Sequence, residues 1–306
     1  MQYASESPAT VDAMRVATWN VNSVKQRHPR LLEWLDQRQP DVVCLQELKM
    51  TDDAFATLVG PDLTERGYEF TSAGQPQWNG VALLSRVGLD DVVPGIPAAP
   101  AFGTRDASPE VEGRAVSAVC GGIRVHSLYT PNGREVDSDH YRYKLAWLAA
   151  LREQIAADDV PQLVCGDMNI APTDHDVFDP AAFAGHTHVT APERDALAAL
   201  QQLGLRDVVR ERWPDDIVFS YWDYRAGMFQ KNYGMRIDLI LASGEVADRR
   251  AAAWVDRQAR KGKGPSDHAP VVLDLDTAPD GDVGPMVPPP SVGRPTTRGV
   301  KLPQAR

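Results

Sequence analysis

Two polar side chains follow a short apolar run in the stretch CGDMNIAPTD, residues 165–174. The run 162–165 has the composition of a buried strand, and Asp167 and Asn169 come shortly after it, two residues apart. A carboxylate and an amide at this spacing can bind a hard cation or a phosphate. Both residue types are also common in turns, where they hydrogen-bond the local backbone. This stretch alone leaves a structural turn and a functional site as equal alternatives.

Other apolar runs of the sequence also begin or end with polar side chains. Such residues lie at or after the ends of the runs 15–19, 42–46 and 123–129, and at or before the starts of the runs 237–242 and 270–275. If the last two runs are antiparallel to the first three, all these side chains meet at one edge of the sheets, as in binding sites of α/β proteins. The residues concerned are Asn20, Asn22, Glu47, Tyr129, Asn132, Asp238, Asp267 and His268.

The residue types of this set indicate one kind of chemistry. Carboxylate and amide oxygens are hard ligands, which predicts a site for Mg²⁺, with Mn²⁺ as the alternative, rather than for zinc. His268 has Asp238 available to orient its ring, and histidine and tyrosine donors around a divalent cation are typical of phosphate ester hydrolysis. The candidate metal ligands are Asn20, Glu47, Asp167, Asn169 and Asp267.

Strand-like and helix-like patterns alternate along most of the chain. Apolar runs rich in valine, isoleucine and leucine have the length of strands. They are 15–19, 42–46, 80–85, 115–120, 123–129, 162–165, 237–242 and 270–275. Between some of them, the segments 28–38, 140–157 and 192–204 have helical patterns, whereas Gly121 and Gly122 join two runs as a hairpin. This mixture predicts an α/β fold, a four-layer α/β sandwich in which two mixed β-sheets pack face to face with helices outside.

The two ends of the 306-residue chain differ in composition from its middle. Residues 1–13 are small and polar, and residues 277–306 contain seven prolines and four glycines with few large apolar groups. Such segments bury too little surface to offset the entropy of ordering. We expect a disordered N-terminal extension at 1–13, one catalytic domain at 14–276 and a Pro-rich disordered tail at 277–306.

Bulk properties exclude several classes of protein. The sequence has no apolar run of about 18 residues, and its N-terminus lacks the features of a secretory signal, which predicts a cytoplasmic protein without membrane spans. The three cysteines lie in apolar stretches without a CxxC pair, so we expect free thiols and no zinc site. The formal net charge of −10 argues only weakly against nucleic acid, because binding depends on where the charge lies.

Six motifs together resemble those of the exonuclease III family of abasic-site endonucleases, which belongs to the deoxyribonuclease I-like superfamily of metal-dependent phosphoesterases. They are TWNVNS (18–23), LQELK (45–49), YTPNG (129–133), GDMN (166–169), RIDLIL (236–241) and SDHAP (266–270). Each motif is weak by itself, but all six occur in the family's order and cover nearly all of 14–276. The segments 166–174 and 219–241 resemble this branch rather than lipid or inositol phosphatases.

The resemblance implies roles around a metal ion. Glu47 matches the metal-binding glutamate of the family, and Asn20 and Asp267 complete or support that site. Asp167 matches an aspartate that activates or orients the attacking water. Asn169 would hold the phosphate or the water beside it.

The resemblance also implies roles in the reaction itself. Tyr129 matches a tyrosine that contacts the phosphate and assists the leaving group. Asp238 would orient His268, whose ring would contact a non-bridging oxygen. The candidate catalytic residues are Tyr129, Asp167, Asn169, Asp238 and His268.

The aromatic segment, residues 219–241, is expected to set the specificity for the substrate. By likeness to the family, Tyr221, Trp222, Met235 and Ile237 wall a small pocket that admits a flipped abasic sugar and excludes a normal nucleotide. Phosphate contacts are expected from Arg225, Lys231, Arg236 and the basic run 257–264, so that a local positive charge compensates for the acidic total. The candidate substrate-binding residues are Asn22, Asn132, Tyr221, Trp222, Arg225, Met235 and Ile237.

Taken together, the resemblance implies a Mg²⁺-dependent DNA repair nuclease that hydrolyses the phosphodiester 5′ to an abasic site and leaves a 3′-hydroxyl. It also implies 3′–5′ exonuclease and 3′-phosphatase activities, and a monomer that binds double-stranded DNA with abasic sites or 3′ ends. Two alternatives stay open. One is a phosphodiesterase of the same superfamily for lipids, inositol phosphates or RNA, and the other is a non-catalytic relative that binds DNA or a partner protein.

Several of these residues also have ordinary structural explanations. Asn20 can be a turn residue, and Tyr129 can be an aromatic residue of the core. Asp238 can form a simple ion pair with Arg236. The basic run 257–264 can be a solvated loop.

Overall fold

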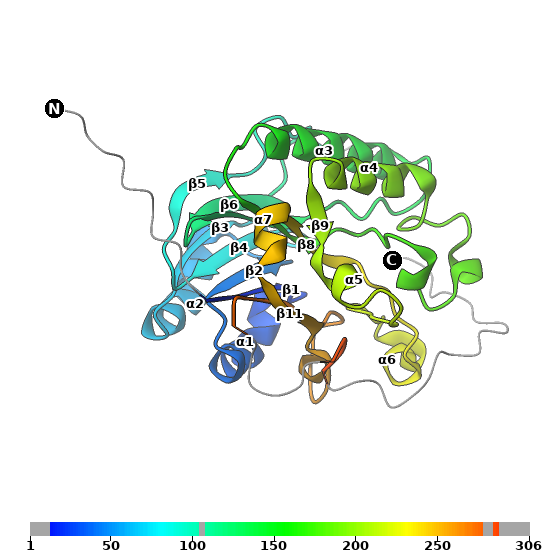
Figure 1. The fold of residues 1–306 in the computed structure, drawn as a ribbon. Coiled ribbons are helices and arrows are strands. Elements are labelled where there is room, and N and C mark those ends of the chain that lie inside the picture. Colours follow the sequence, from blue (N-terminus) through cyan, green and yellow to red (C-terminus); the bar gives the residue numbers. More distant parts are fainter. Residues whose placement is uncertain (1–12, 104–107, 278–283, 288–306) are drawn as a thin grey trace.

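The structure is a computed structural model that describes residues 13–103, 108–277 and 284–287. It confirms the predicted four-layer α/β sandwich, because two six-stranded mixed sheets pack face to face and helices cover their outer faces (Figure 1). Apart from Ala13, the predicted N-terminal extension lies outside the described residues. The same is true of 278–283 and 288–306 in the predicted tail.

Each sheet contains one parallel pair of strands with antiparallel strands beside it. The first sheet has the order β11 (Arg250–Val255), β12 (Val271–Leu275), β1 (Met14–Asn20), β2 (Val42–Gln46), β4 (Val81–Ser85) and β3 (Glu69–Ala73). The second sheet has the order β5 (Asp90–Pro94), β6 (Ala115–Cys120), β7 (Ile123–Tyr129), β8 (Gln162–Asp167), β10 (Asp238–Ser243) and β9 (Leu205–Asp207). The parallel pairs are β1 with β2 and β7 with β8, so the carboxyl ends of each pair lie at one edge of its sheet.

Helices cover the outer faces of both sheets (Figure 1). They are α1 (Val24–Arg38), α2 (Asp52–Glu65), α3 (Asp139–Ala156) and α4 (Ala191–Gln201). The short helices α5 (Val208–Arg212), α6 (Met228–Lys231) and α7 (Gly244–Asp248) instead pack against the apolar layer between the sheets. The helices α1 and α2 pack on the first sheet, and α3 and α4 pack on the second. Ser138 and Thr190 cap α3 and α4, because each side chain accepts a hydrogen bond from the first turn. Among the described residues, no helix is long and apolar enough to span a membrane.

The alternation of side chains along the strands creates three apolar layers. In β1, Val16 belongs to the layer between the sheets, whereas Ala17 faces α1 and α2. In β8, Leu163 lies between the sheets and Val164 faces α3 and α4. Because both faces of each sheet are buried, the central strands appear in the sequence as nearly continuous apolar runs.

Four strands and one long helix are absent from the predicted elements. The strands β3, β5, β9 and β11 all lie at sheet edges. Edge strands have one unpaired side and tend to be short or polar, so no apolar run marks them. The helix α2 contains Pro61 close to its end, which obscures its helical pattern.

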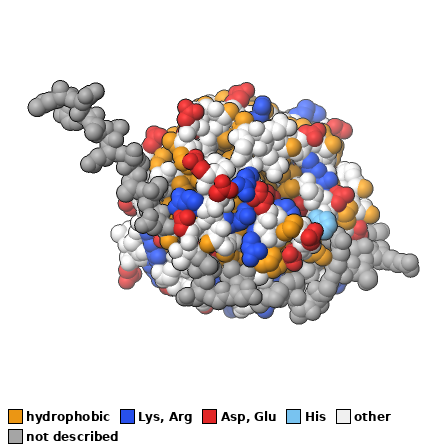
Figure 2. All heavy atoms as spheres, viewed as in Figure 1, with side chains coloured by type: hydrophobic (Ala, Val, Ile, Leu, Met, Phe, Trp, Pro, Cys, Tyr) orange, Lys and Arg blue, Asp and Glu red, His pale blue; other side chains and the backbone are white. Residues whose placement is uncertain are grey.

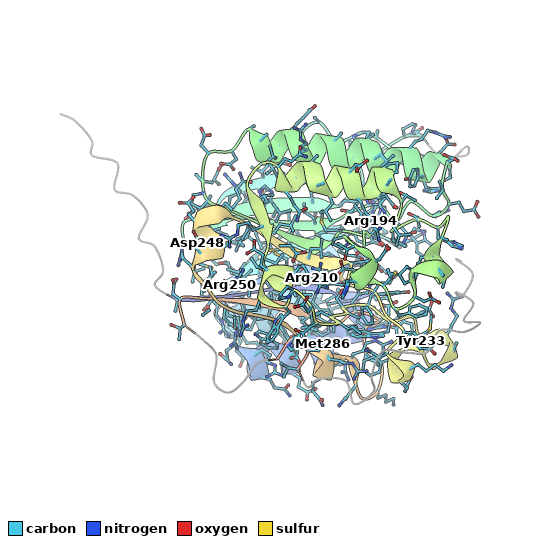
Figure 3. All side chains as sticks on the ribbon, turned by 45° about the vertical axis from the view of Figure 1, so that its right-hand side comes forward. Arg194, Arg210, Tyr233, Asp248, Arg250 and Met286 are labelled. Atoms are coloured by element: carbon cyan, nitrogen blue, oxygen red, sulfur yellow. The ribbon has the colours of Figure 1, made fainter. Side chains whose placement is uncertain are left out.

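Part of the predicted disordered tail is ordered. Residues 284–287 run alongside β11, where Val255 N–H donates to the carbonyl oxygen of Pro285 and Val287 N–H donates to that of Val255. The Met286 side chain, labelled in Figure 3, is fully buried. The prediction of disorder is therefore wrong for these four residues. One methionine fills a gap beside the sheet, and the open edge of β11 supplies backbone partners.

Candidate active site

Several strands of both sheets begin or end at one place in the molecule, where the carboxyl ends of the parallel strands lie. The parallel strands β1 and β2 end there with Asn20 beside Gln46, and β7 and β8 end with Tyr129 opposite Asp167. The strand β10 runs antiparallel to β8, so its first residue, Asp238, also lies opposite Asp167. The strand β12 runs antiparallel to β1, which brings the residues that precede β12 to the same edge. Chain segments far apart in the sequence thus place polar side chains at one site.

Glu47, Asp167 and His268 form the centre of this site. One side-chain atom of each residue, a carboxylate oxygen or a ring nitrogen, lies within 4.8 Å of the other two. The Asn20 side chain joins two of these residues, because its Nδ2 donates to Glu47 Oε1 at 2.7 Å and to Asp167 Oδ2 at 3.0 Å. Its Oδ1 accepts from the backbone N–H of Asn22. Asn20 is therefore held as a donor that orients two carboxylates, which suits support of a metal site better than direct ligation.

His268 is held between two aspartates. Its Nδ1 donates to Asp238 at 2.8 Å, and its Nε2 lies 3.8 Å from Asp167 Oδ2. Ser220 Oγ donates to the Asp238 carboxylate at 2.6 Å and so holds it in place. Burial lowers the pKa of His268, but Asp238, together with Asp167 and Asp267, outweighs burial and raises the pKa to about 10. The ring is therefore a cation at neutral pH, which can donate to an anionic oxygen but cannot act as a base.

The carboxylates of the site repel one another. Burial raises the pKa of Asp167 to about 7, with Asp238 and Glu47 adding to the rise and His268 opposing it. Burial also raises the pKa of Asp267, against the effect of His268. A buried group of like charges favours a bound cation, and carboxylate oxygens suit a hard divalent metal. The donor set therefore fits a metal ion held by Glu47 together with Asp167 or Asp267.

Lys49 is a site residue that is not among the predicted ones. Its Nζ lies 2.9 Å from Glu47 Oε2 and donates to Asn22 Oδ1 at 2.6 Å. Burial raises the pKa of Glu47, but Lys49 and the hydrogen bond from Asn20 lower it below its usual value, so the carboxylate stays ionised. Asn22 donates in turn to Asp267 at 3.0 Å. Asn22, predicted to bind substrate, thus links Lys49 to Asp267. Its position in the motif LQELK, two residues after Glu47, is the feature of the sequence that could have indicated this role.

Two asparagines lie side by side next to Asp167. Asn132 Nδ2 donates to Asn169 Oδ1 at 3.1 Å, and Asn169 Nδ2 donates to the carbonyl oxygen of Thr130 at 2.9 Å. The backbone N–H of Asn169 donates to Asp167 Oδ1 at 2.9 Å. Asn169 therefore helps to fix the Asp167 carboxylate, while ligation of a metal by its amide oxygen stays a prediction.

A cavity of about 1310 Å³ lies beside these residues. Tyr221 on its wall packs against His268, with ring centroids 4.8 Å apart. Tyr233, labelled in Figure 3, lies on the same wall. Pockets for small ligands are usually about 300–1,000 Å³, so this cavity has room for a segment of a polymer. The predicted residues that line it are Glu47, Tyr129, Asn132, Tyr221, Arg225 and Met235.

Trp222 and Ile237 do not wall this cavity, contrary to the prediction. Trp222 is fully buried, and its Nε1 donates to Asn232. It follows Tyr221 in an extended segment that pairs with Met235, so its side chain points to the opposite side. Ile237 is buried in the apolar layer between the sheets. Of the four residues predicted to wall the pocket, Tyr221 and Met235 therefore face the cavity.

Several basic residues that were expected to contact phosphates are buried instead. Arg236 is 1% exposed and forms ion pairs with Asp176 and Asp207. Arg257 and Arg260 of the basic run are also buried, and each donates to a backbone carbonyl oxygen of the aromatic segment. These arginines therefore hold the aromatic segment in place. The two lysines of the basic run are exposed and keep the predicted role.

The wall around Tyr129 carries side chains that no motif indicates. Arg114 lies over the Tyr129 ring at 4.9 Å, and its Nη1 donates to the Tyr129 carbonyl oxygen at 3.3 Å. Burial and Glu47 raise the pKa of Tyr129 well above its usual value, so its hydroxyl stays protonated. The other residues of this wall include Trp78, Glu112, Arg134, His140 and Tyr143. Most of them lie between the motifs, so the sequence offered no sign of them.

The face that carries α5 and α7 has basic side chains interspersed with acidic ones (Figure 2). Arg206 pairs with Glu211 and Asp248 there, and Arg250 pairs with the same glutamate. These charges neutralise one another, so this face lacks the continuous positive patch that is typical of a nucleic-acid interface. Arg114 and Arg225 on the cavity wall are also paired, with Glu112 and Asp223. The cavity is the better candidate for such an interface because it lies beside the polar cluster of the site.

Comparison with known proteins shows the family. The model of the endonuclease/exonuclease/phosphatase family matches residues 17–268, which span the whole site. The chain belongs to this family. Exodeoxyribonuclease III from Haemophilus influenzae is 30% identical over 269 residues, which cover 84% of this chain and 98% of that protein.

Solved structures of the endonuclease/exonuclease/phosphatase family have the same fold. The 3′ phosphatase NExo from Neisseria, bound to a product DNA hairpin, is 36% identical with a TM-score of 0.80, and the match covers 86% of this chain and 100% of that one. An AP endonuclease from Archaeoglobus fulgidus is 32% identical with a TM-score of 0.79, with the same coverage. These similarities confirm the predicted exonuclease III branch and, with it, a metal-dependent nuclease.

Proposed function

We propose that this member of the endonuclease/exonuclease/phosphatase family is a Mg²⁺-dependent DNA repair nuclease. It would hydrolyse the phosphodiester 5′ to an abasic site and process the 3′ ends of duplex DNA. The observation that carries the proposal is the cluster of Glu47, Asp167 and the Asp238–His268 pair beside the cavity. An ionised metal-binding carboxylate, a carboxylate base and a cationic donor are the groups that hydrolysis of an anionic diester requires.

The side chains have distinct tasks in this proposal. Asp167, whose pKa is raised to about 7, accepts the proton of the attacking water. His268 donates through Nε2 to a non-bridging phosphate oxygen, and Asp238 keeps the ring protonated and oriented. Tyr129 has a protonated hydroxyl at the end of β7 and donates toward the leaving oxygen. One such donor or base contributes roughly 10²–10⁴ in rate.

Glu47, together with Asp167 or Asp267, would hold the metal ion. A bound Mg²⁺ neutralises part of the phosphate charge and stabilises the charge that develops in the transition state. Lys49 keeps Glu47 ionised, because its Nζ lies 2.9 Å from Glu47 Oε2. Asn20 donates a hydrogen bond to each of the carboxylates of Glu47 and Asp167 and so holds both in place.

The related structures support two classes of DNA substrate. NExo from Neisseria is described as a 3′ phosphatase and as a 3′–5′ exonuclease, and the Archaeoglobus fulgidus protein as an AP endonuclease. Tyr221 and Met235 form an apolar part of the cavity wall beside His268. An apolar wall suits a sugar that has lost its base, and flipping is least unfavourable where the base is missing. We therefore propose incision at abasic sites together with processing of 3′ ends.

Cleavage of defined duplexes tests this function. One duplex carries a single tetrahydrofuran abasic analogue, and a second carries a 3′-phosphate. We expect Mg²⁺-dependent incision 5′ to the analogue and release of the phosphate, and neither with a chelator or with the His268→Ala protein. If the folded protein with Mg²⁺ leaves both duplexes intact but hydrolyses bis-p-nitrophenyl phosphate, its substrate is another diester. Binding of DNA without any hydrolysis would identify a non-catalytic relative.

We also propose that the protein acts as a monomer in the cytoplasm, with duplex DNA as its partner. All three cysteines are free and buried, which suits a reducing compartment. Sedimentation of the protein alone and with duplex DNA tests the monomer, because a dimer would double the mass of the free protein.

A further inference from the structure

A lysine in the middle of α3 is completely buried. The Lys144 side chain has no exposed surface, although it belongs to a helix that covers the second sheet. It lies in the apolar stripe of α3 between Tyr141 and Leu148, at a position where an aliphatic residue would satisfy the helical pattern. Its partner is Glu193 in the first turn of α4, whose side chain is also fully buried, with Nζ and Oε1 2.5 Å apart.

The same ammonium group reaches the candidate active site. Lys144 Nζ donates to the carbonyl oxygen of Asn169 at 2.7 Å and to that of Asn132 at 3.3 Å. Its three donors are therefore directed at three acceptors from three different segments. Thr187 Oγ1 joins the same network, since it lies 2.6 Å from Glu193 Oε1, to which its single proton is donated, and 3.1 Å from the Asn132 carbonyl oxygen.

The two carbonyl groups belong to the loops that carry the paired asparagines of the site. The side chains of Asn132 and Asn169 are hydrogen-bonded to each other, and the backbone N–H of Asn169 donates to Asp167 Oδ1. Asn169 has a φ of 50°, a left-handed conformation that asparagine adopts more readily than most residues. The ammonium group of Lys144 holds the carbonyl group of this residue from behind.

Stability alone does not explain an ion pair at this place. Replacing a buried ion pair by well-packed apolar side chains is often neutral or stabilising. An apolar side chain at position 144, however, has no donor for two carbonyl oxygens at once. The loop of Asn132 is also packed closely against this network at Gly133. A Cβ at this glycine would lie 2.8 Å from Thr187 Oγ1 and 3.1 Å from Lys144 Cδ.

We propose that Lys144 and Glu193 are positioning residues for the reaction. They clamp the loops of Asn132 and Asn169 from behind and so hold the two amides and Asp167 in the geometry that hydrolysis needs. The inference rests on the proposed function, because it assigns a task within that active site. It goes beyond the motifs, since neither residue lies in one of the six.

The double substitution Lys144→Met with Glu193→Gln tests this role. It removes both charges without leaving one of them buried and unpaired, and the glutamine oxygen still accepts from Thr187 and from the His188 N–H. We expect kcat on the protein's DNA substrate to fall by about 10- to 100-fold, as for other residues that support a site from behind, with less than about a threefold change in KM. We also expect faster hydrogen exchange at 130–134 and 168–170 in the protein without substrate.

A matched control removes an ion pair at the opposite end of β7. Arg124 lies at the start of that strand and pairs with Asp158 at 2.9 Å and with the exposed Asp91, whereas the site lies at its end. The variant Arg124→Met with Asp158→Asn should keep the wild-type kcat and the wild-type exchange in both loops. If the Lys144 double variant instead keeps the wild-type kcat and exchange, the pair has no positioning role.

A second variant covers the case in which the double variant does not fold. Thr187→Val removes one hydroxyl of the same network and buries no charge, so it should lower kcat in the same direction by a smaller factor. An unchanged kcat in a folded Thr187→Val protein would contradict the proposal.

Hydrogen exchange separates this inference from the proposed function. Inactivity of the wild type on DNA would refute the function, while the exchange of the two loops still shows whether the clamp exists.

Discussion

Replacing Asp238 by asparagine is a direct test of the electrostatics at the site. In the wild type the pKa of His268 is about 10, because Asp238, which accepts from Nδ1, together with Asp167 and Asp267 outweighs the effect of burial. At pH 7.5 such a ring is almost completely protonated. Without the Asp238 carboxylate, only Asp167 and Asp267 oppose burial, so the pKa should fall and less of the ring should be protonated.

The lower protonation and the loss of the orienting bond should together lower activity at pH 7.5 by about 10²–10³. The pH profile separates the two effects. A raised pKa keeps the cation up to high pH, so the alkaline limb that belongs to His268 lies near pH 10 in the wild type. In Asp238→Asn it should move to lower pH, and cleavage of the abasic duplex between pH 5 and 10 measures this shift.

A buried aspartate far from the site provides the control. Asp274 in β12 is almost fully buried, pairs with Arg15 and accepts from Trp254. Asp274→Asn should lower the stability and leave the pH profile unchanged. If Asp238→Asn keeps an alkaline limb near that of the wild type, the assignment of His268 as a cationic donor is wrong.

Three further predictions concern the site, the tail and the pH dependence of stability. Asp167→Asn should fold and lose about 10²–10⁴ in single-turnover rate, because the base is removed; a near wild-type rate would contradict this. Met286→Ala should lower the free energy of unfolding by about 2–4 kcal/mol, since the side chain is fully buried, and an unchanged urea midpoint would mean that 284–287 do not pack on the sheet. Against the effect of burial, Arg236 and Lys144 lower the pKa values of Asp176 and Glu193 to about 2. Both folded pKa values are depressed, so this stabilisation is complete above about pH 4.5 and disappears as the pH falls toward 2. The loss is about 2 kcal/mol for Asp176 and about 3 kcal/mol or slightly more for Glu193, measurable by urea unfolding at pH 7, 4 and 2.5.

The position of the site was predictable because it depends on local properties of the sequence. Apolar runs mark the central strands, and the residues at their ends must lie at a sheet edge, whatever surrounds them. Asp167 opposite Tyr129 and Asp238 follows from this rule once the strands are paired. The residue types then restrict the chemistry, because carboxylates and amides bind hard cations.

The functions of several basic and aromatic residues depended on partners that no local pattern shows. Arg236 is typical of a phosphate contact in sequence, but Asp176 and Asp207, 60 and 29 residues away, neutralise it in the interior. Trp222 belongs to the predicted pocket in sequence, but its side chain points into the core beside Asn232. Burial and pairing are properties of the assembled layers, so short motifs do not record them.

The sequence by itself therefore determined the fold class, the family and the set of polar residues from which the site is built. Only the tertiary structure decided which of them meet, which are buried and what supports them from behind. The Lys144–Glu193 pair and the ordered residues 284–287 illustrate the difference. A lysine in a helix and a methionine among prolines carry no signal of their own. Each acquires its role because distant segments pack around it and leave it one set of partners.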